Sequence, residues 1–296
     1  GGHVHLDVHE VHRVEDVGAG EDLGVVVRAG AAGDLVAHLR PALAAVGRAP
    51  ETARARAQFD GRIQHAQVPG LREDVRGEGV GEADRDEEQL VDRDLPFLQS
   101  PLDQPVKVEL VKGRQMQNHF LPEVLPQISG WSTAAVFKPA RKVAGDFYDA
   151  FRFKNSNLTA FIIADVVDKG VGAALFMVLF RSLLRAFSER QVDCDNVQEQ
   201  LLDIVLSTNN FIAEYHGRSN MFATMFFGIL DPDSGVLYYA NGGHEPPIVM
   251  DKEGAIICRL MPTGPAVGMF PDLEFRVEQM RMNKGDLLLG FTDGAT

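Results

Sequence analysis

The amino-acid alphabet of this 296-residue chain changes near residue 100, and this change limits what each half can fold into. Residues 1–100 consist almost entirely of Ala, Asp, Glu, Gly, Val, Leu, Pro, His, Gln and Arg. The exceptions are Thr52, Phe59, Ile63, Phe97 and Ser100. Because large core-filling side chains are scarce there, we expect residues 1–100 to be unstructured. All ten common types have codons that begin with G or C, so a mis-called reading frame would explain the bias, with a sensory input domain as the alternative.

Residues 101–130 use the full range of residue types and are expected to form a linker helix. The pattern from residue 106 to residue 120 is helical, and Pro122 ends it. One stripe of this helix is half apolar and comprises Val108, Val111, Gln115 and His119. Such a helix either caps the domain that follows or forms a signalling coiled coil, which would give a homodimer through the linker helix.

Charge and cysteine content exclude several classes of function. The formal net charge of -13 argues against a nucleic-acid partner, because phosphate binding needs a clustered Lys/Arg surface. Cys194 and Cys258 lie outside any disulfide framework or zinc motif. The most apolar stretch, residues 171–180, is interrupted by Arg181 and is shorter than the roughly 20 residues of a membrane span. We therefore expect a cytoplasmic protein without a membrane segment and with a protein or small-molecule substrate.

Beyond residue 130, apolar periodicity predicts a domain of the α+β class over residues 131–296. Runs rich in aromatic and β-branched residues predict strands at 132–137 and 158–164. Apolar residues at helical spacing predict helices at 172–188 and 196–215. Strands return at 222–230, 235–240, 248–250, 256–260, 275–282 and 286–291. This order favours helices packed outside antiparallel sheets.

Three acidic clusters carry the candidate chemistry. They contain Asp146 with Asp149, Asp165 with Asp168, and Asp293. An aspartate after an apolar run usually only begins a turn, and each cluster alone would be read that way. Together, carboxylates on converging loops suit hard divalent cations such as Mg²⁺ or Mn²⁺. Two such ions could activate a water and neutralise a phosphoryl group, without a serine or cysteine nucleophile.

The order and spacing of these motifs resemble the SpoIIE/RsbU branch of the bacterial PPM phosphatases. The matching segments are 137–141 (Phe-Lys-Pro-Ala-Arg), 145–149 (Gly-Asp-Phe-Tyr-Asp), 164–175, 241–247 (Asn-Gly-Gly-His-Glu-Pro-Pro), 263–265 (Thr-Gly-Pro) and 292–294 (Thr-Asp-Gly). The resemblance implies a PPM-type β-sandwich of two antiparallel sheets flanked by helices. It further implies two Mn²⁺ or Mg²⁺ ions and hydrolysis of phosphoserine or phosphothreonine on a protein such as an anti-sigma-factor antagonist.

Site roles follow from the resemblance by position. Asp146 and Asp165 would bridge the metals, the Val166 backbone carbonyl would complete one shell, and Asp293 would serve the other. Arg141 is a candidate for gripping phosphate, with a surface arginine as the alternative. His244 is expected to shape the turn beside the site, and a general-acid role is the weaker interpretation. Asp149 is a candidate for the outer shell.

The chain departs from the family pattern in three places. Ala144 and Asp168 stand where glycine is usual. The sequence ends at Thr296, before the last strand of the family and the aspartate that completes the first metal site, so we expect a truncated domain with weakened metal binding. The alternative function is a non-catalytic module that binds a phosphoprotein or transmits a signal. Retention of Asp146, Asp165 and Asp293 favours the enzyme lineage.

Overall fold

The computed structural model describes residues 22–29, 103–138, 143–189 and 195–292. The chain divides into two units, residues 1–48 with 109–296, and residues 49–108. Of the second unit, only the first turns of helix α2 (Asp103–Phe120) are described. All other described elements belong to the first unit, to which the following description refers.

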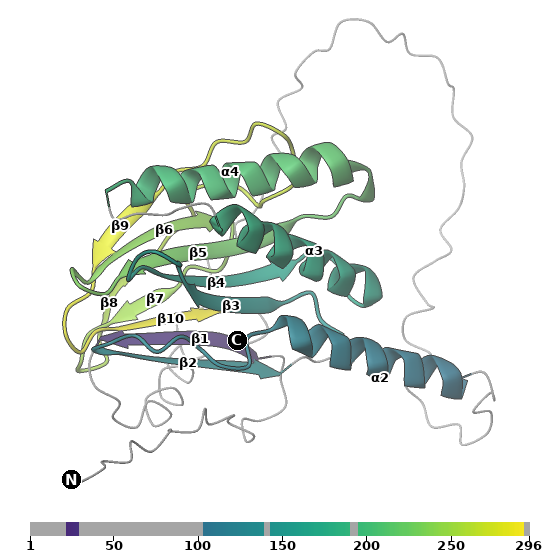
Figure 1. The fold of residues 1–296 in the computed structure, drawn as a ribbon, viewed down its shortest axis with the longest axis horizontal. Helices are drawn as coiled ribbons and strands as arrows, with labels where there is room; N and C mark the ends of the chain where they lie inside the picture. The colour runs from purple at the N-terminus through teal and green to yellow at the C-terminus, as the bar shows by residue number, and fades with distance from the viewer. Residues whose placement is uncertain (1–21, 30–102, 139–142, 190–194, 293–296) are drawn as a thin grey trace, which may run out of the picture. The chain divides into compact units, whose positions relative to one another are not determined.

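Two five-stranded antiparallel sheets form this unit (Figure 1). The first sheet has the order β2 (Trp131–Lys138), β1 (Asp22–Ala29), β10 (Leu287–Phe291), β7 (Ile248–Met250) and β8 (Ile256–Arg259). The second has the order β3 (Phe147–Arg152), β4 (Thr159–Val166), β5 (Ala223–Asp231), β6 (Val236–Gly242) and β9 (Glu278–Arg281). The two sheets pack face to face, so each strand must alternate its side chains between two environments.

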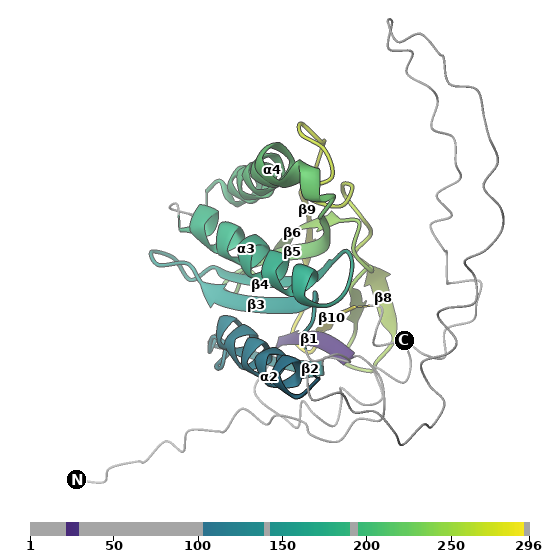
Figure 2. The same cartoon turned by 90° about the vertical axis from the view of Figure 1, so that its right-hand side faces the viewer.

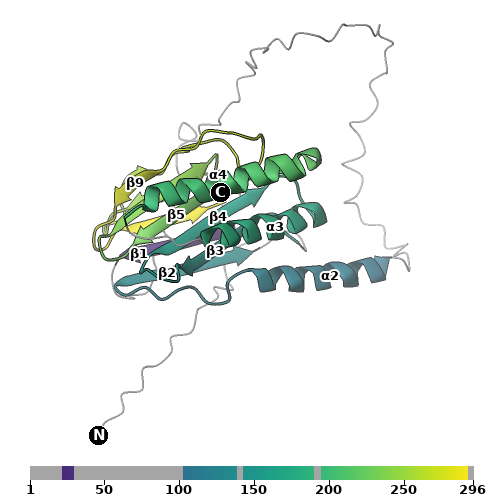
Figure 3. The same cartoon turned by 45° about the horizontal axis from the view of Figure 1, so that its top comes forward.

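Two helices cover the outer face of the second sheet. Helix α3 (Val171–Ser188) and helix α4 (Val197–His216) lie side by side over it, as Figures 2 and 3 show from two directions. A short 3₁₀ helix, η2 (Gly217–Ser219), follows α4. One apolar core fills the space between these helices and the second sheet, and another fills the space between the sheets. Strand β4 is buried on both faces, because Ile162 faces the helices and Phe161 and Ile163 face the other sheet.

Helix α3 is long and apolar enough to cross a membrane by length and composition alone. In the structure it is a core helix instead. Met177, Phe180 and Leu184 are fully buried in the core against the sheet. Arg181 and Arg185 form ion pairs with a buried aspartate of β3, so these two charged side chains of the helix are neutralised within the domain.

The architecture confirms the α+β class and the two antiparallel sheets with flanking helices. Three elements differ from the prediction. Strand β3 was missed, and β9 covers only the end of the expected run 275–282. Strand β1 lies within residues 1–100, where no regular structure was expected, and pairs antiparallel with both β2 and β10. Its valine-rich sequence suits a strand. The remaining residues of that segment lie outside the described part of the chain.

Helix α2 caps the domain with the face opposite the predicted stripe. Val108 and Val111 of that stripe are about half exposed, at 50% and 47%. Gln117 and Leu121, on the other side, are buried. The buried face of α2 therefore packs on the domain that follows, as the capping alternative expected.

Candidate active site

Asp146 and Asp165 lie opposite each other where β3 begins and β4 ends. The antiparallel register pairs Phe147 with Ala164, and Asp146 and Asp165 are the next residues of the two chain segments beyond that pair. Directly opposite residues of an antiparallel pair project to the same face of the sheet. Because Phe147 and Ala164 face the helices, the two carboxylates are on the face that looks toward the other sheet.

A glycine lets the loop before β3 lie directly on the end of β4. A Cβ atom at Gly145 would be 2.9 Å from the Val166 backbone oxygen and 3.3 Å from the Cβ atoms of Val166 and Ala173. Only a residue without a side chain fits this approach. The Val166 carbonyl, predicted as a metal ligand, is therefore adjacent to the loop that carries Asp146.

The end of β10 joins the same place. The Thr292 hydroxyl donates a hydrogen bond of 2.9 Å to Oδ2 of Asp146, although the two residues are far apart in sequence. Thr292 is buried and immediately precedes Asp293. Asp293 itself, and also Arg141, lie outside the described residues. The structure thus brings together the chain segments of three predicted carboxylates and describes two of them.

His244 is buried behind this edge, only 3% exposed. Its Nδ1 is 2.9 Å from the hydroxyl of Thr224, which pairs with Asp165 across β4 and β5. Its backbone is held by reciprocal hydrogen bonds with the buried Asn241 side chain. Its Nε2 is buried without a hydrogen bond of normal geometry among the described residues, although the backbone of Phe291 lies close enough to favour the charged ring.

Burial decides the charge of this imidazole. Desolvation lowers the pKa of His244 from its ordinary value to about 4, and the smaller effect of the Phe291 backbone acts in the opposite direction. The ring is therefore neutral near pH 7 and shielded from solvent. This arrangement agrees with the expected role in shaping the turn and disfavours a general acid.

Asp149, the candidate for the outer shell, is engaged elsewhere. Its carboxylate is fully buried and accepts hydrogen bonds of 2.6 and 2.7 Å from Nε and a terminal nitrogen of Arg185. Arg181 Nε lies 3.1 Å away, an ionic contact that lacks hydrogen-bond geometry. The Arg185 guanidinium also lies 4.0 Å from the ring centre of Phe151. Asp149 therefore fastens α3 to β3 on the helix-covered face, away from the face of Asp146.

The residues present fit a hard divalent cation in their donor chemistry. Two carboxylates and a backbone carbonyl lie at one end of the β3–β4 strand pair. Because Gly145 has no side chain, the loop before β3 can approach closely enough for these groups to share one site. Among the described residues, no group of three or more His, Cys, Asp or Glu side chains is close enough to hold a metal. The third predicted carboxylate, Asp293, is outside that search.

Sequence reasoning missed two side chains that organise this edge, Thr224 and Thr292. Thr292 stood inside a quoted motif, but only the Asp beside it was assigned a role. Thr224 carried no motif at all. The only sequence signal for Thr224 is its position near the start of an apolar run, and this run pairs with the strand that contains Asp165.

Comparisons with known proteins relate this chain to a known family. Residues 155–296 match the model of the SpoIIE family, described as stage II sporulation protein E. Protein IcfG of Synechocystis sp. is 47% identical over 209 residues, covering 64% of this chain and 33% of that protein. The phosphoserine phosphatase RsbU of Bacillus subtilis is 28% identical over 195 residues, covering 66% of this chain and 55% of that protein. The chain thus spans between a third and about half of the length of these relatives.

The fold has a counterpart among solved structures. The SiaA-PP2C domain of Pseudomonas aeruginosa superposes with a TM-score of 0.50 at 17% identity, over 63% of this chain and 71% of that one. This likeness concerns the fold alone. The motifs and the family match place residues 155–296 in the SpoIIE family, and the domain that contains them is similar to SpoIIE/RsbU-type PPM phosphatase domains.

Proposed function

We propose that this domain hydrolyses phosphoserine or phosphothreonine on a signalling protein, with two Mn²⁺ or Mg²⁺ ions bound at the edge formed by β3, β4 and β10. Asp146 and Asp165 would bridge the ions, the Val166 carbonyl would complete one shell, and Asp293 would serve the other. The bound ions would supply a metal-activated water and neutralise charge on the phosphoryl group. Arg141 remains a candidate for gripping phosphate.

One observation supports this proposal above the others. Three chain segments meet here. The β3–β4 register brings the segments of Asp146 and Asp165 together, and Asp146 accepts a hydrogen bond from the Thr292 hydroxyl, 146 residues away in sequence. A structural turn aspartate needs no such convergence. The serine phosphatase activity of the relative RsbU supports the same reaction class.

The chain's own residues have positioning tasks in this proposal. The Thr292 hydroxyl orients one carboxylate oxygen of Asp146, and Gly145 keeps that residue against the Val166 carbonyl. His244 and Thr224 support the edge from the buried side. Since a buried neutral imidazole is a poor proton donor to solvent-exposed substrate, we assign His244 no proton transfer.

The proposed substrate is a phosphorylated anti-sigma-factor antagonist, and the proposed location of the reaction is the cytoplasm. A homodimer through α2 is supported by its exposed apolar residues, among them Val111 and Met116, the latter 66% exposed. Replacement of Val111 by Glu should then shift the measured mass in solution from dimer to monomer.

Hydrolysis of a phosphoserine peptide, followed by phosphate release with Mn²⁺ and with EDTA, tests the reaction. Any phosphate release should require Mn²⁺ and stop with EDTA. Asp146→Asn and Asp165→Asn should each abolish it while the far-ultraviolet circular dichroism stays unchanged, since each removes a formal charge from a site with few protein ligands. A chain that binds the phosphopeptide without hydrolysing it would be the non-catalytic module instead.

A further inference from the structure

A glutamine of helix α2 holds the loop that carries Asp146. The Gln117 side chain donates a hydrogen bond of 2.6 Å from Nε2 to the Ala144 carbonyl and accepts one of 3.0 Å at Oε1 from the Ala144 N–H. Both polar ends of the amide are thereby used, and the side chain is only 5% exposed. Ala144 is separated from Asp146 by Gly145 alone.

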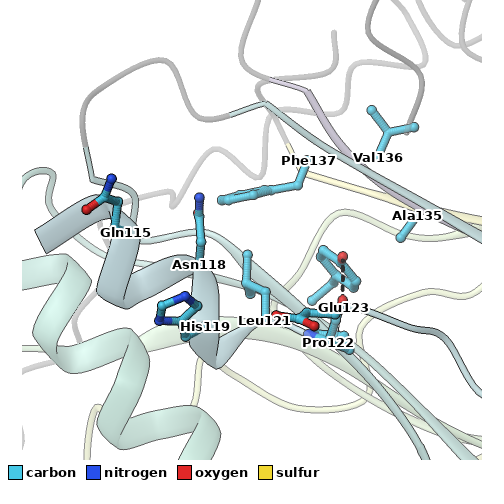
Figure 4. Close-up of a pocket in the computed structure, with 10 residues that line it drawn as sticks. Gln115, Asn118, His119, Leu121, Pro122, Glu123, Ala135, Val136 and Phe137 are labelled. Atoms are coloured by element: carbon cyan, nitrogen blue, oxygen red, sulfur yellow. Dashed lines mark hydrogen bonds between the residues drawn. The ribbon is translucent and has the colours of Figure 1, made fainter. Parts of the chain in front are cut away.

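Neighbouring contacts fix the helix turn from which Gln117 projects. One turn earlier, a Cβ at Gly113 would be 3.9 Å from Val143, so the helix lies against the residue before Ala144. Further on, Leu121 is buried in the core. The Tyr148 hydroxyl donates to the Pro122 carbonyl at 3.3 Å, the dashed contact in Figure 4.

The loop has two restraints of opposite kind. On one side Gly145 lies close to the Val166 carbonyl, and Val166 is held by its pairing with Ala223 of β5. On the other side Gln117 holds both backbone polar groups of Ala144. A side-chain amide that pairs with one residue's N–H and C=O restrains the peptide groups on both sides of that residue, as a strand neighbour would. Asp146 lies two residues beyond Ala144, with only Gly145 between them.

We propose that Gln117 is a positioning residue for the metal site, acting through the Ala144 backbone to hold Asp146 at the distance from Asp165 that the cations require. This inference rests on the proposed metal-dependent function. Groups that orient metal ligands from outside the shell typically change metal affinity about 10- to 100-fold when replaced. Because Gln117 acts through one peptide, we expect the lower end of that range.

The experiment compares four forms of the full chain by calorimetric titration with Mn²⁺, at a temperature where each is folded by circular dichroism. They are the unsubstituted chain, Gln117→Leu, Gln117→Glu and the matched control Gln115→Leu. Gln115 is on the same helix but exposed, and it is one of the residues that line the cavity of about 490 Å³ beside the last turn of α2 (Figure 4). Gln117→Glu keeps the acceptor for the Ala144 N–H and loses the donor to its carbonyl.

We expect Mn²⁺ affinity to fall about 10-fold in Gln117→Leu, by less in Gln117→Glu, and to stay unchanged in Gln115→Leu. A merely structural role would lower the unfolding temperature without moving the affinity of the folded protein. Equal Mn²⁺ affinity in Gln117→Leu and the unsubstituted chain would overturn this inference and leave the proposed function standing. Failure of the unsubstituted chain to bind Mn²⁺ at all would overturn both.

Discussion

Replacement of Gly145 by alanine is the substitution whose effect follows most directly from the geometry of the site. The new Cβ would be 2.9 Å from the Val166 oxygen, closer than side-chain carbons approach a backbone oxygen, and would also meet two other carbons at 3.3 Å. Val166 is buried and pairs with Ala223 of β5, so its oxygen is held in place. Either the loop that carries Asp146 shifts by a few tenths of an ångström, or the new Cβ stays too close to the Val166 oxygen.

Overpacking of this kind costs about 1–3 kcal/mol of stability. Metal sites tolerate displacements of about 0.2 Å in ligand distance, so a shift of the loop should also weaken Mn²⁺ binding about 10-fold. We expect both losses in Gly145→Ala, measured by urea unfolding and by calorimetric titration. The control is Gly172→Ala, where a Cβ meets nothing within 4 Å and alanine favours the helix by about 0.5–1 kcal/mol. Wild-type stability and Mn²⁺ affinity in Gly145→Ala would refute the close-approach argument.

Two further substitutions test the parts of the domain that support the site. Asp149→Asn removes a buried charge that faces two arginines, and should cost about 2–3 kcal/mol in urea unfolding, reduced from the usual 3–5 because the Arg185 side chain is 36% exposed. A loss below about 1 kcal/mol would contradict the ion-pair assignment. His244 has a folded-state pKa of about 4 against an ordinary value of 6.5, so the unfolded chain takes up its proton first and stability should fall by about 3 kcal/mol between pH 6.5 and pH 4. In His244→Asn this part of the pH dependence should disappear from the unfolding free energy, and an unchanged pH profile would show that the ring is accessible to protons when folded.

The sequence predicted the elements that carry a clear local apolar pattern. Helices α3 and α4 were recognised by apolar residues at helical spacing, and strands β5 and β7 as apolar runs bounded by turn signals. Strand β3 was missed because Asp149 and Arg152 interrupt its apolar pattern. Asp149 is tolerated there only because Arg185, 36 residues later, neutralises it, and no local signal reveals that pair.

The end of the predicted run 275–282 shows a second limit. Phe275 and Val277 pack against the core, which explains their apolar side chains. The segment before β9 does not join the sheet, and its Arg276 N–H donates a hydrogen bond to the Thr263 carbonyl instead. Burial and strand pairing are separate requirements, and periodicity detects only burial. Similarly, the departure at Asp168 was noticed in sequence, and the structure gives its reason: φ is 75°, a conformation that glycine adopts without strain and aspartate tolerates.

The candidate site was predictable in its carboxylates but not in its supports. Asp146 and Asp165 were selected by motif, and the register of β3 and β4 brings them together. The hydrogen bonds from Thr292 to Asp146 and from Gln117 to Ala144 span 146 and 27 residues. Such contacts depend on the packing of whole elements, so a single sequence carries no pattern for them.

The central claim is that Asp146 and Asp165 form a divalent metal site, and a calorimetric titration with Mn²⁺ tests it most directly. The comparison is between the unsubstituted chain, Asp165→Asn, and Asp168→Asn, which removes the same charge from an exposed position three residues further along the chain. The account predicts a loss of affinity of at least about 100-fold in Asp165→Asn, and of no more than about 3-fold in Asp168→Asn, because exposed charges contribute less than about 1 kcal/mol. Equal Mn²⁺ affinity in Asp165→Asn and the unsubstituted chain would contradict it.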